Sequence, residues 1–205
     1  SLEEIALELA LDGITDQEHD LILQAKAGPV SDSQYNLLNA TVSEQLTSYI
    51  GNLEQDRFSA IKSPTLFVTK PGLEEMAGET NDRGYFVSLP KINENITIVS
   101  GNNDIPEYYP YLDGTSLYLA ALIPSEAADL FELTPGDTII AIPTWSDAYE
   151  SIVVQISGIF ERKPSGENIW YLEETILEAS TGSTFATIPF YIPQSTFLND
   201  LGPAF

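Results

Sequence analysis

Few side chains in this 205-residue chain could carry out catalysis. The chain has one histidine, His19, and no cysteine. Thiolate catalysis, Cys-ligated zinc and Cys-held iron–sulfur clusters are therefore excluded, and so is a metal site built from several histidines. His19 stands just before the apolar residues 21–23, and no nucleophile motif surrounds it. We interpret His19 as a polar residue at the entrance of a strand rather than as a catalytic base.

Carboxylates are the remaining candidates for catalysis. Glu74 and Glu75 are adjacent, as are Glu173 and Glu174, and a glycosidase needs two carboxyl groups at a fixed separation. Adjacent pairs arise easily in a chain with 31 acidic residues, so the pattern favours a solvated surface, with a carboxylate-based hydrolase as a third option. No phosphate-binding loop, nucleophile elbow or calcium-loop pattern is present. We therefore expect no enzyme activity, no cofactor and no metal site.

The charge of the chain excludes further classes of function. The chain contains eight Lys and Arg residues and 31 Asp and Glu residues, which gives a net charge of −23. Nucleic acids and anionic bilayers are bound through basic patches, so neither is an expected partner. Hydrophobic residues make up 43% of the chain and no apolar run reaches 18 residues, so we expect a folded domain without a membrane span. The chain begins without Met, and we expect it to be a piece of a longer protein.

The first third of the chain predicts one β–α–β unit. Helical spacing of apolar residues predicts a helix over residues 2–11, and residues 20–27 are typical of a strand. Apolar residues spaced by three and four predict an amphipathic helix over residues 32–50, with an N-cap at residues 31–33 and an end at Gly51. A second strand region covers residues 58–69, where Pro64 indicates an edge or a bulge.

The rest of the chain predicts many short strands. The predicted strands cover residues 85–87, 96–99, 117–122, 138–142 and 151–160, and residues 185–192 are apolar again. Short helices are predicted over residues 124–131 and 194–201, with a tight turn at residues 134–137. The fold class that follows is α+β.

An aromatic loop is the candidate contact surface. Tyr108, Tyr109 and Tyr111 lie in a Pro- and Tyr-rich stretch over residues 105–112, which we expect to be a loop, and Trp145 is a further candidate. Aromatic rings stack on sugars and peptides, although core or rim packing explains such residues as well. This loop motivates one alternative for the chain, a free secreted glycan- or peptide-binding module.

A resemblance to a known family rests on residues 119–161. The stretch contains a strand, a short helix, the turn Thr134-Pro135-Gly136-Asp137-Thr138-Ile139, and a strand that ends in Ser157-Gly158-Ile159-Phe160-Glu161. This pattern resembles the extracytoplasmic (periplasmic-core) domain of ABC transporter permeases of the MacB/FtsX-like type. The resemblance covers about 40 residues well and most of the chain loosely.

The resemblance implies a function and an architecture. In that family a separate ATPase hydrolyses ATP, and a second permease and a substrate or accessory protein are further partners. The domain is non-catalytic, lies on the extracytoplasmic face of the bacterial cell membrane, and transmits conformational change. Its architecture is two-lobed, which here implies an N-terminal helix and β–α–β lobe near the membrane over residues 1–75 and a β-rich outer lobe with a short helix and a return segment over residues 76–205. Interleaving of the two lobes along the chain is left open. Such domains usually return through a further strand and helix, whereas this chain ends at Phe205.

Three residues of the motif have predicted structural roles. Gly136 is expected to supply a positive φ or a close approach in the turn. Asp137 is expected to cap that turn through the backbone, and Gly158 to let its strand bulge or pack tightly. None of these roles is chemical.

Overall fold

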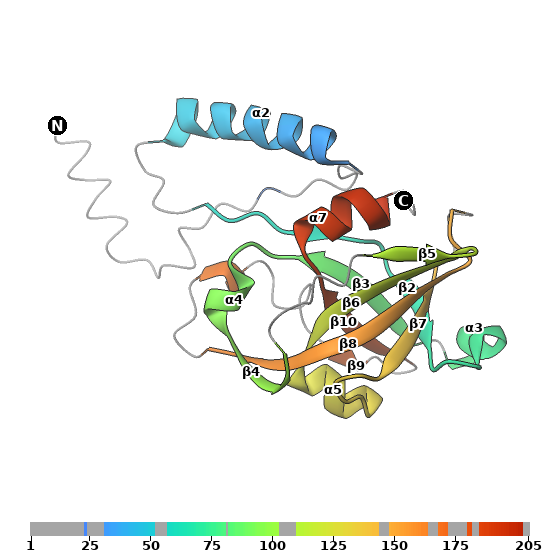
Figure 1. The fold of residues 1–205 in the computed structure, drawn as a ribbon. Coiled ribbons are helices and arrows are strands. Elements are labelled where there is room, and N and C mark those ends of the chain that lie inside the picture. The colour runs from blue at the N-terminus through green and yellow to red at the C-terminus, as the bar shows by residue number, and fades with distance from the viewer. Residues whose placement is uncertain are drawn as a thin grey trace.

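Short strands make up most of the part of the chain that the computed structural model describes, which comprises Leu23 and residues 31–51, 57–80, 82–102, 110–143, 148–163, 168–171, 180–181 and 185–202 (Figure 1). The strands are β1 (Ile61–Lys62), β2 (Leu66–Thr69), β3 (Arg83–Ser88), β4 (Ile96–Gly101), β5 (Tyr111–Asp113), β6 (Ser116–Pro124), β7 (Thr138–Ile142), β8 (Ser151–Arg162), β9 (Ser180–Thr181) and β10 (Ala186–Tyr191). The helices and helical turns are α2 (Asp32–Ile50), η2 (Glu74–Met76), α3 (Ala77–Thr80), α4 (Ile92–Asn95), α5 (Ser125–Phe131), η3 (Asn168–Tyr171), α7 (Gln194–Thr196) and η4 (Phe197–Leu201).

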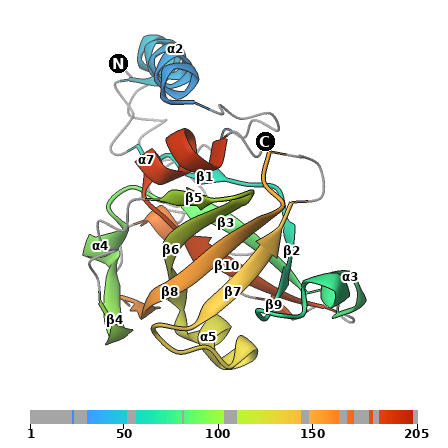
Figure 2. The same cartoon turned by 45° about the vertical axis from the view of Figure 1, so that its right-hand side comes forward.

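Six of the strands close into a ring. The hydrogen-bonded order runs β3–β2–β7–β8–β6–β10, and a further pairing of β10 with β3 joins the two ends. Two pairs are parallel, β6 with β8 and β3 with β10, and the others in the ring are antiparallel. The result is a small barrel, seen in Figure 2. Buried apolar side chains fill its interior.

A β-bulge in β8 divides the apolar residues between two clusters. Ile156 pairs with Ala121 of β6, but the next paired residue is Gly158, opposite Leu122, so Ser157 is an extra residue. Before the bulge, Ile152, Val154 and Ile156 point into the barrel core, whereas after it Ile159 does so and Phe160 joins an outer cluster. The extra residue therefore reverses the alternation of the strand, as a bulge requires.

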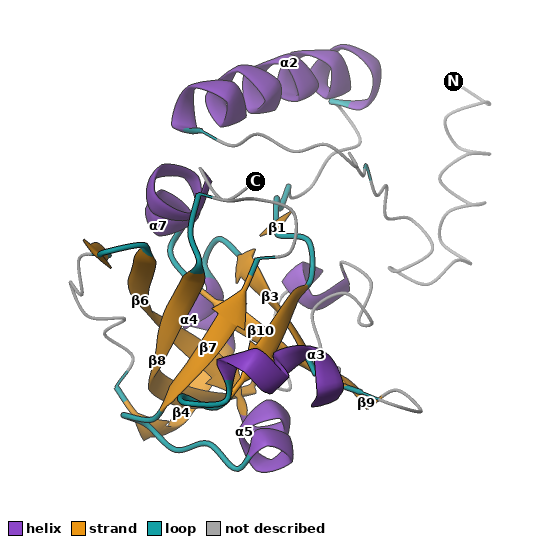
Figure 3. Cartoon of the chain, turned by 90° about the vertical axis from the view of Figure 1, so that its right-hand side faces the viewer, coloured by secondary structure: helices purple, strands orange, loops and turns teal. Residues whose placement is uncertain are grey.

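Helices close both ends of the barrel. At one end, Ala127 and Ala128 of α5 are buried in the barrel core. At the opposite end, Phe197, Leu198 and Leu201 of η4 belong to the same core. Figure 3 shows α5 below the strands, and α7 and α2 above them. Both ends of the barrel are therefore shielded from water by apolar side chains.

The outer cluster packs on the other face of β3, β6, β8 and β10. It consists of Tyr85, Val87, Leu89, Ile96, Leu122, Phe160, Ile169, Trp170 and Tyr191. The rings of Phe160 and Tyr191 meet edge to face, with centroids 5.2 Å apart at 84°, whereas those of Phe160 and Trp170 are stacked. This second cluster anchors β4, α4 and η3 to the barrel.

The long helix α2 forms where the sequence predicts it. The Ser31 hydroxyl accepts a hydrogen bond from the Gln34 N–H at 3.4 Å, which confirms the predicted N-cap. The predicted amphipathic face is only partly covered, because no α2 residue is buried and Tyr49 is 80% exposed. Tyr35 links the helix to the domain through a hydrogen bond between its hydroxyl and that of Ser59, at 2.8 Å.

The structure confirms the α+β class and corrects several details. Residues 63–65 split the predicted strand 58–69 into β1 and β2, at the position of Pro64. Tyr111 and Leu112, predicted in a loop, form strand β5 because they pair with Tyr118 and Leu117 of β6. The predicted helix 2–11 and strand 20–27 lie outside the described residues, apart from Leu23.

The two predicted lobes share one sheet in the described part of the chain. Strand β2, from the segment 1–75, pairs with β3 and β7 of the segment 76–205. Strand β1 likewise pairs with β3. The segments therefore interleave at the barrel, and residue 75 does not separate one sheet from another.

Candidate functional site

The turn at residues 134–137 has the geometry that its sequence predicts. Gly136 has a φ of +96°, a conformation that favours glycine. The carboxylate of Asp137 accepts hydrogen bonds from the Thr134 N–H at 2.7 Å and from the Thr134 hydroxyl at 2.8 Å. These two bonds, the backbone one first, hold the pKa of Asp137 below its ordinary value. Both predictions for this turn are confirmed.

The same turn is tied to the strand β8. The Gly136 N–H donates to the Ile156 carbonyl at 2.7 Å, and the Ile156 N–H donates to the Asp137 carbonyl at 2.8 Å. The bulged Ser157 follows directly, and its hydroxyl donates to the Ala121 carbonyl at 3.0 Å. A Cβ at Gly158 would lie 2.6 Å from the Asn102 carbonyl oxygen. Gly158 therefore permits both the bulge and the close approach, as predicted.

The aromatic contact residues are only partly visible. Tyr108, Tyr109 and Trp145 lie outside the described residues. Tyr111 is 46% exposed, and its ring stacks on that of Tyr118 with centroids 4.7 Å apart and planes 7° apart. One face of the Tyr111 ring is therefore occupied within the chain, and its role in partner contact stays a prediction.

The carboxylate candidates do not come together into a site in the described residues. Glu74 accepts a hydrogen bond from the Gly72 N–H at 3.0 Å, which lowers its pKa, and Glu75 is exposed beside it. Glu173, Glu174 and His19 lie outside the described residues. Within the described part of the chain, no three acidic or His side chains gather at one point.

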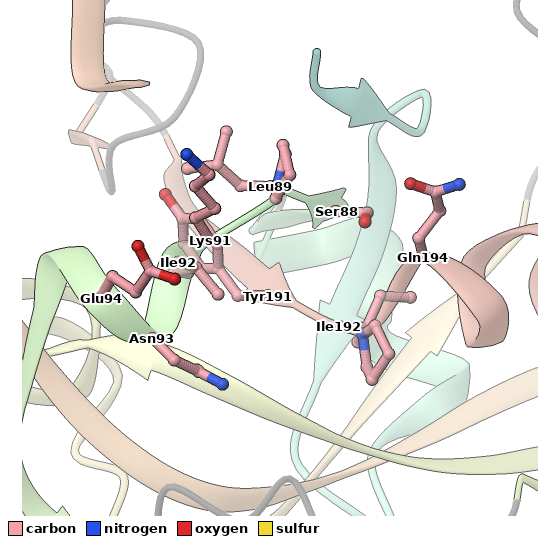
Figure 4. Close-up of a pocket in the computed structure, with 11 residues that line it drawn as sticks. Ser88, Leu89, Lys91, Ile92, Asn93, Glu94, Tyr191, Ile192 and Gln194 are labelled. Carbon is pink, nitrogen blue, oxygen red and sulfur yellow. The ribbon is translucent and has the colours of Figure 1, made fainter. Parts of the chain in front are cut away.

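A cavity that the sequence did not reveal opens beside α4 (Figure 4). It has a volume of about 320 Å³ and is lined by two segments, residues 88–94 and 191–194. These segments continue the parallel strands β3 and β10 past their carboxyl ends. The segment after β3 leads into α4, and the segment after β10 leads into α7. The divergence of two adjacent parallel strands leaves a crevice at their carboxyl ends.

Positive charges surround the outer cluster. The Lys62 ammonium lies 3.9 Å from the centroid of the Tyr85 ring, and the Arg162 guanidinium lies 4.5 Å from that of Trp170. Burial lowers the pKa of Lys62. Cations placed over aromatic rings are attracted by the ring quadrupole. This flank of the domain therefore carries cations, in a chain whose net charge is −23.

A tyrosine joins the β7–β8 connection to the C-terminal helical segment. The Tyr149 hydroxyl donates to the Asp200 carbonyl oxygen at 2.7 Å. Desolvation, and then the nearby Asp200 charge, raises the pKa of Tyr149. Desolvation also raises the pKa of the Asp200 carboxyl. The contact holds the end of the barrel that η4 covers.

Comparisons with protein-family models, curated proteins and solved structures returned no significant match. In the described part of the chain, no helix combines the length and the hydropathy needed to cross a bilayer.

Proposed function

We propose that this chain is a non-catalytic extracytoplasmic domain of an ABC transporter permease of the MacB/FtsX-like type. The observation that carries the proposal is the bonding of the Gly136–Asp137 turn to Ile156. It joins the two parts of the sequence pattern that resembles this family. The two separated parts of the pattern therefore belong to one packed unit of this chain. This supports the resemblance, because the pattern corresponds to a structural unit rather than to unrelated segments.

The arrangement of the barrel suits a domain that transmits motion. The helices α2 and α7 lie at one end of the barrel, and α5 lies at the other end (Figure 1). If the α2 and α7 end faces the membrane, α5 and the turn at residues 134–137 face outward toward a substrate or accessory protein. A closed barrel with a packed interior moves as a rigid body, because its strands have no open edge along which to slide.

Under this proposal a separate ATPase subunit supplies the energy, and a second permease completes the transporter. The experiment is affinity purification of the whole gene product from detergent-solubilised membranes of its native host. The proposal expects an ABC-type ATPase in stoichiometric amounts among the co-purified proteins. Recovery of the gene product without an ATPase, at detergent conditions that keep known transporters intact, contradicts it.

A further inference from the structure

The cavity beside α4 has an apolar floor and a polar rim. Leu89, Tyr191 and Ile192 form the floor and are each at most 5% exposed. Lys91, Asn93 and Glu94 are exposed at the rim. A volume of about 320 Å³ equals that of roughly ten water molecules. Sites for small molecules have this size and this division between apolar walls and a few polar groups.

Two opposite charges stand at one end of this cavity. Lys91 is the N-cap of α4 and Glu94 lies in its first turn, and Figure 4 shows both at the same end of the cavity. In the described structure neither charged group has an ion-pair partner. The Lys91 ammonium lies 5.9 Å from the centroid of the Phe58 ring, at the outer limit of a cation–π contact.

The backbone presents Lys91 in an uncommon conformation. Its φ is +56°, in the left-handed region that a lysine rarely adopts. Its carbonyl oxygen accepts bonds from the Glu94 N–H at 3.0 Å and from the Asn95 side-chain amide at 3.1 Å. The Asn95 residue is only 3% exposed, so this turn is anchored in the fold. Residues held in sparsely populated conformations cluster at ligand-binding positions.

These features specify the chemistry of an occupant. A cation and a carboxylate that do not pair with each other match a molecule carrying one charge of each sign. The amide side chains of Asn93 and Gln194 each both donate and accept hydrogen bonds, as a peptide group requires. The buried floor matches an apolar side chain. Because the charges of the lining cancel, a neutral zwitterion fits better than an anion or a cation.

We propose that the cavity between α4 and α7 binds a zwitterionic ligand, an amino acid or short peptide with an apolar side chain. The ligand carboxylate contacts Lys91, and the ligand ammonium contacts Glu94. The apolar side chain lies on Leu89, Tyr191 and Ile192. This inference does not depend on the transporter assignment, because it concerns only the described pocket.

Isothermal titration calorimetry at pH 7 tests the proposal with leucine, leucyl-leucine and the uncharged N-acetyl-leucinamide. The expected result is saturable binding of a zwitterion, with the uncharged analogue at least roughly tenfold weaker, since each lost partner removes a charge-assisted hydrogen bond. Lys91→Gln and Glu94→Gln should each weaken binding by roughly tenfold or more. The matched controls are Lys70→Gln and Glu132→Gln, because these residues form an exposed pair outside the cavity. Neither control should change the affinity.

A charge-swapped double variant, Lys91→Glu with Glu94→Lys, distinguishes the loss of a binding charge from unfolding of the protein. It should bind more tightly than either single charge-removing variant, because both charges are present again. Circular dichroism confirms that each variant is folded. The proposal is overturned by no binding of either zwitterion, by equal binding of N-acetyl-leucinamide, or by affinities that neither charge removal alters.

Discussion

The N–H of Gly136 and the carbonyl oxygen of Ile156 are 2.7 Å apart, and the Ile156 N–H returns a bond to Asp137 at 2.8 Å. This reciprocal pair fixes the turn between α5 and β7 against β8. It also places the turn beside the bulge at Ser157. The part of the sequence that carries the family resemblance is therefore a single packed unit, although its two halves are 20 residues apart along the chain.

Glycine substitutions in this unit should separate backbone strain from steric overlap. Gly136→Ala should lower the free energy of unfolding by about 1–2 kcal/mol, because a side chain is disfavoured at its positive φ although no atom lies within 4 Å of the new Cβ. Gly158→Ala should cost more, because its Cβ would overlap the Asn102 carbonyl oxygen at 2.6 Å. Chemical denaturation measures both values. Gly78→Ala, in open space without positive φ, is the control and should cost nothing.

The carboxylate of Asp137 should make the stability of the turn depend on pH. Its pKa is lowered from 3.8 by the hydrogen bonds from Thr134, so the stabilisation is fully present above about pH 4 and declines as the pH falls through the lowered value. Asp137→Ala should therefore reduce the melting temperature at pH 7 and reduce it less at pH 3. A difference between wild type and variant that stays constant over this range would refute the charged cap.

The hydroxyl of Tyr149 should stabilise the end of the barrel at neutral pH. Tyr149→Phe removes its bond to the Asp200 carbonyl and should cost about 1 kcal/mol. The folded-state pKa of Tyr149 is raised, so this contribution is complete below pH 10.0 and is lost as the pH rises through the folded value. Tyr118→Phe is the matched control, since the described structure gives that hydroxyl no hydrogen bond. Equal effects of the two variants in thermal melts would argue against the contact.

The indole nitrogen of Trp170 should contribute little to the stability of the fold. It is buried, and in the described structure it has no hydrogen-bond partner. Trp170→Phe keeps an aromatic ring near Phe160 and Tyr191 while it removes a donor that burial leaves unsatisfied. We expect a change within about 1 kcal/mol for Trp170→Phe and a loss of about 3–5 kcal/mol for Trp170→Ala. A loss for Trp170→Phe as large as that for Trp170→Ala would contradict this expectation.

Local chemistry was predictable from the sequence, and pairing between distant segments was not. The turn around Gly136 depends on residues within four positions of one another, and the Ser31 cap acts within the first turn of α2. The parallel pairing of β3 with β10 joins residues about 100 positions apart, and no local pattern specifies such a pairing.

The cavity was missed for the same reason. Its two walls come from the ends of β3 and β10, so it exists only once those strands are paired. Lys91 and Glu94 by themselves are typical of an exposed helix start, so they gave no local signal of a cavity. The β-branched residues of 151–160 predicted β8 as well, but the bulge at Ser157 depends on its partner strand β6.

The most direct test of the transporter proposal is the labelling of single cysteines in intact cells. Because these 205 residues contain no cysteine, one can be introduced by Glu126→Cys, which is exposed on α5, or by Ala127→Cys, which is fully buried beside it. Both are made in the whole gene product, with any other cysteines replaced by serine. A membrane-impermeant maleimide is then added, and the membrane fraction is collected.

The Glu126→Cys protein should be labelled in intact cells and recovered with membranes. The Ala127→Cys protein should be labelled only after denaturation. Labelling of the Glu126→Cys protein only after the cells are lysed would place the domain in the cytoplasm and contradict the account. Recovery of the labelled protein in the culture medium would contradict it as well, and would instead favour a free secreted binding module.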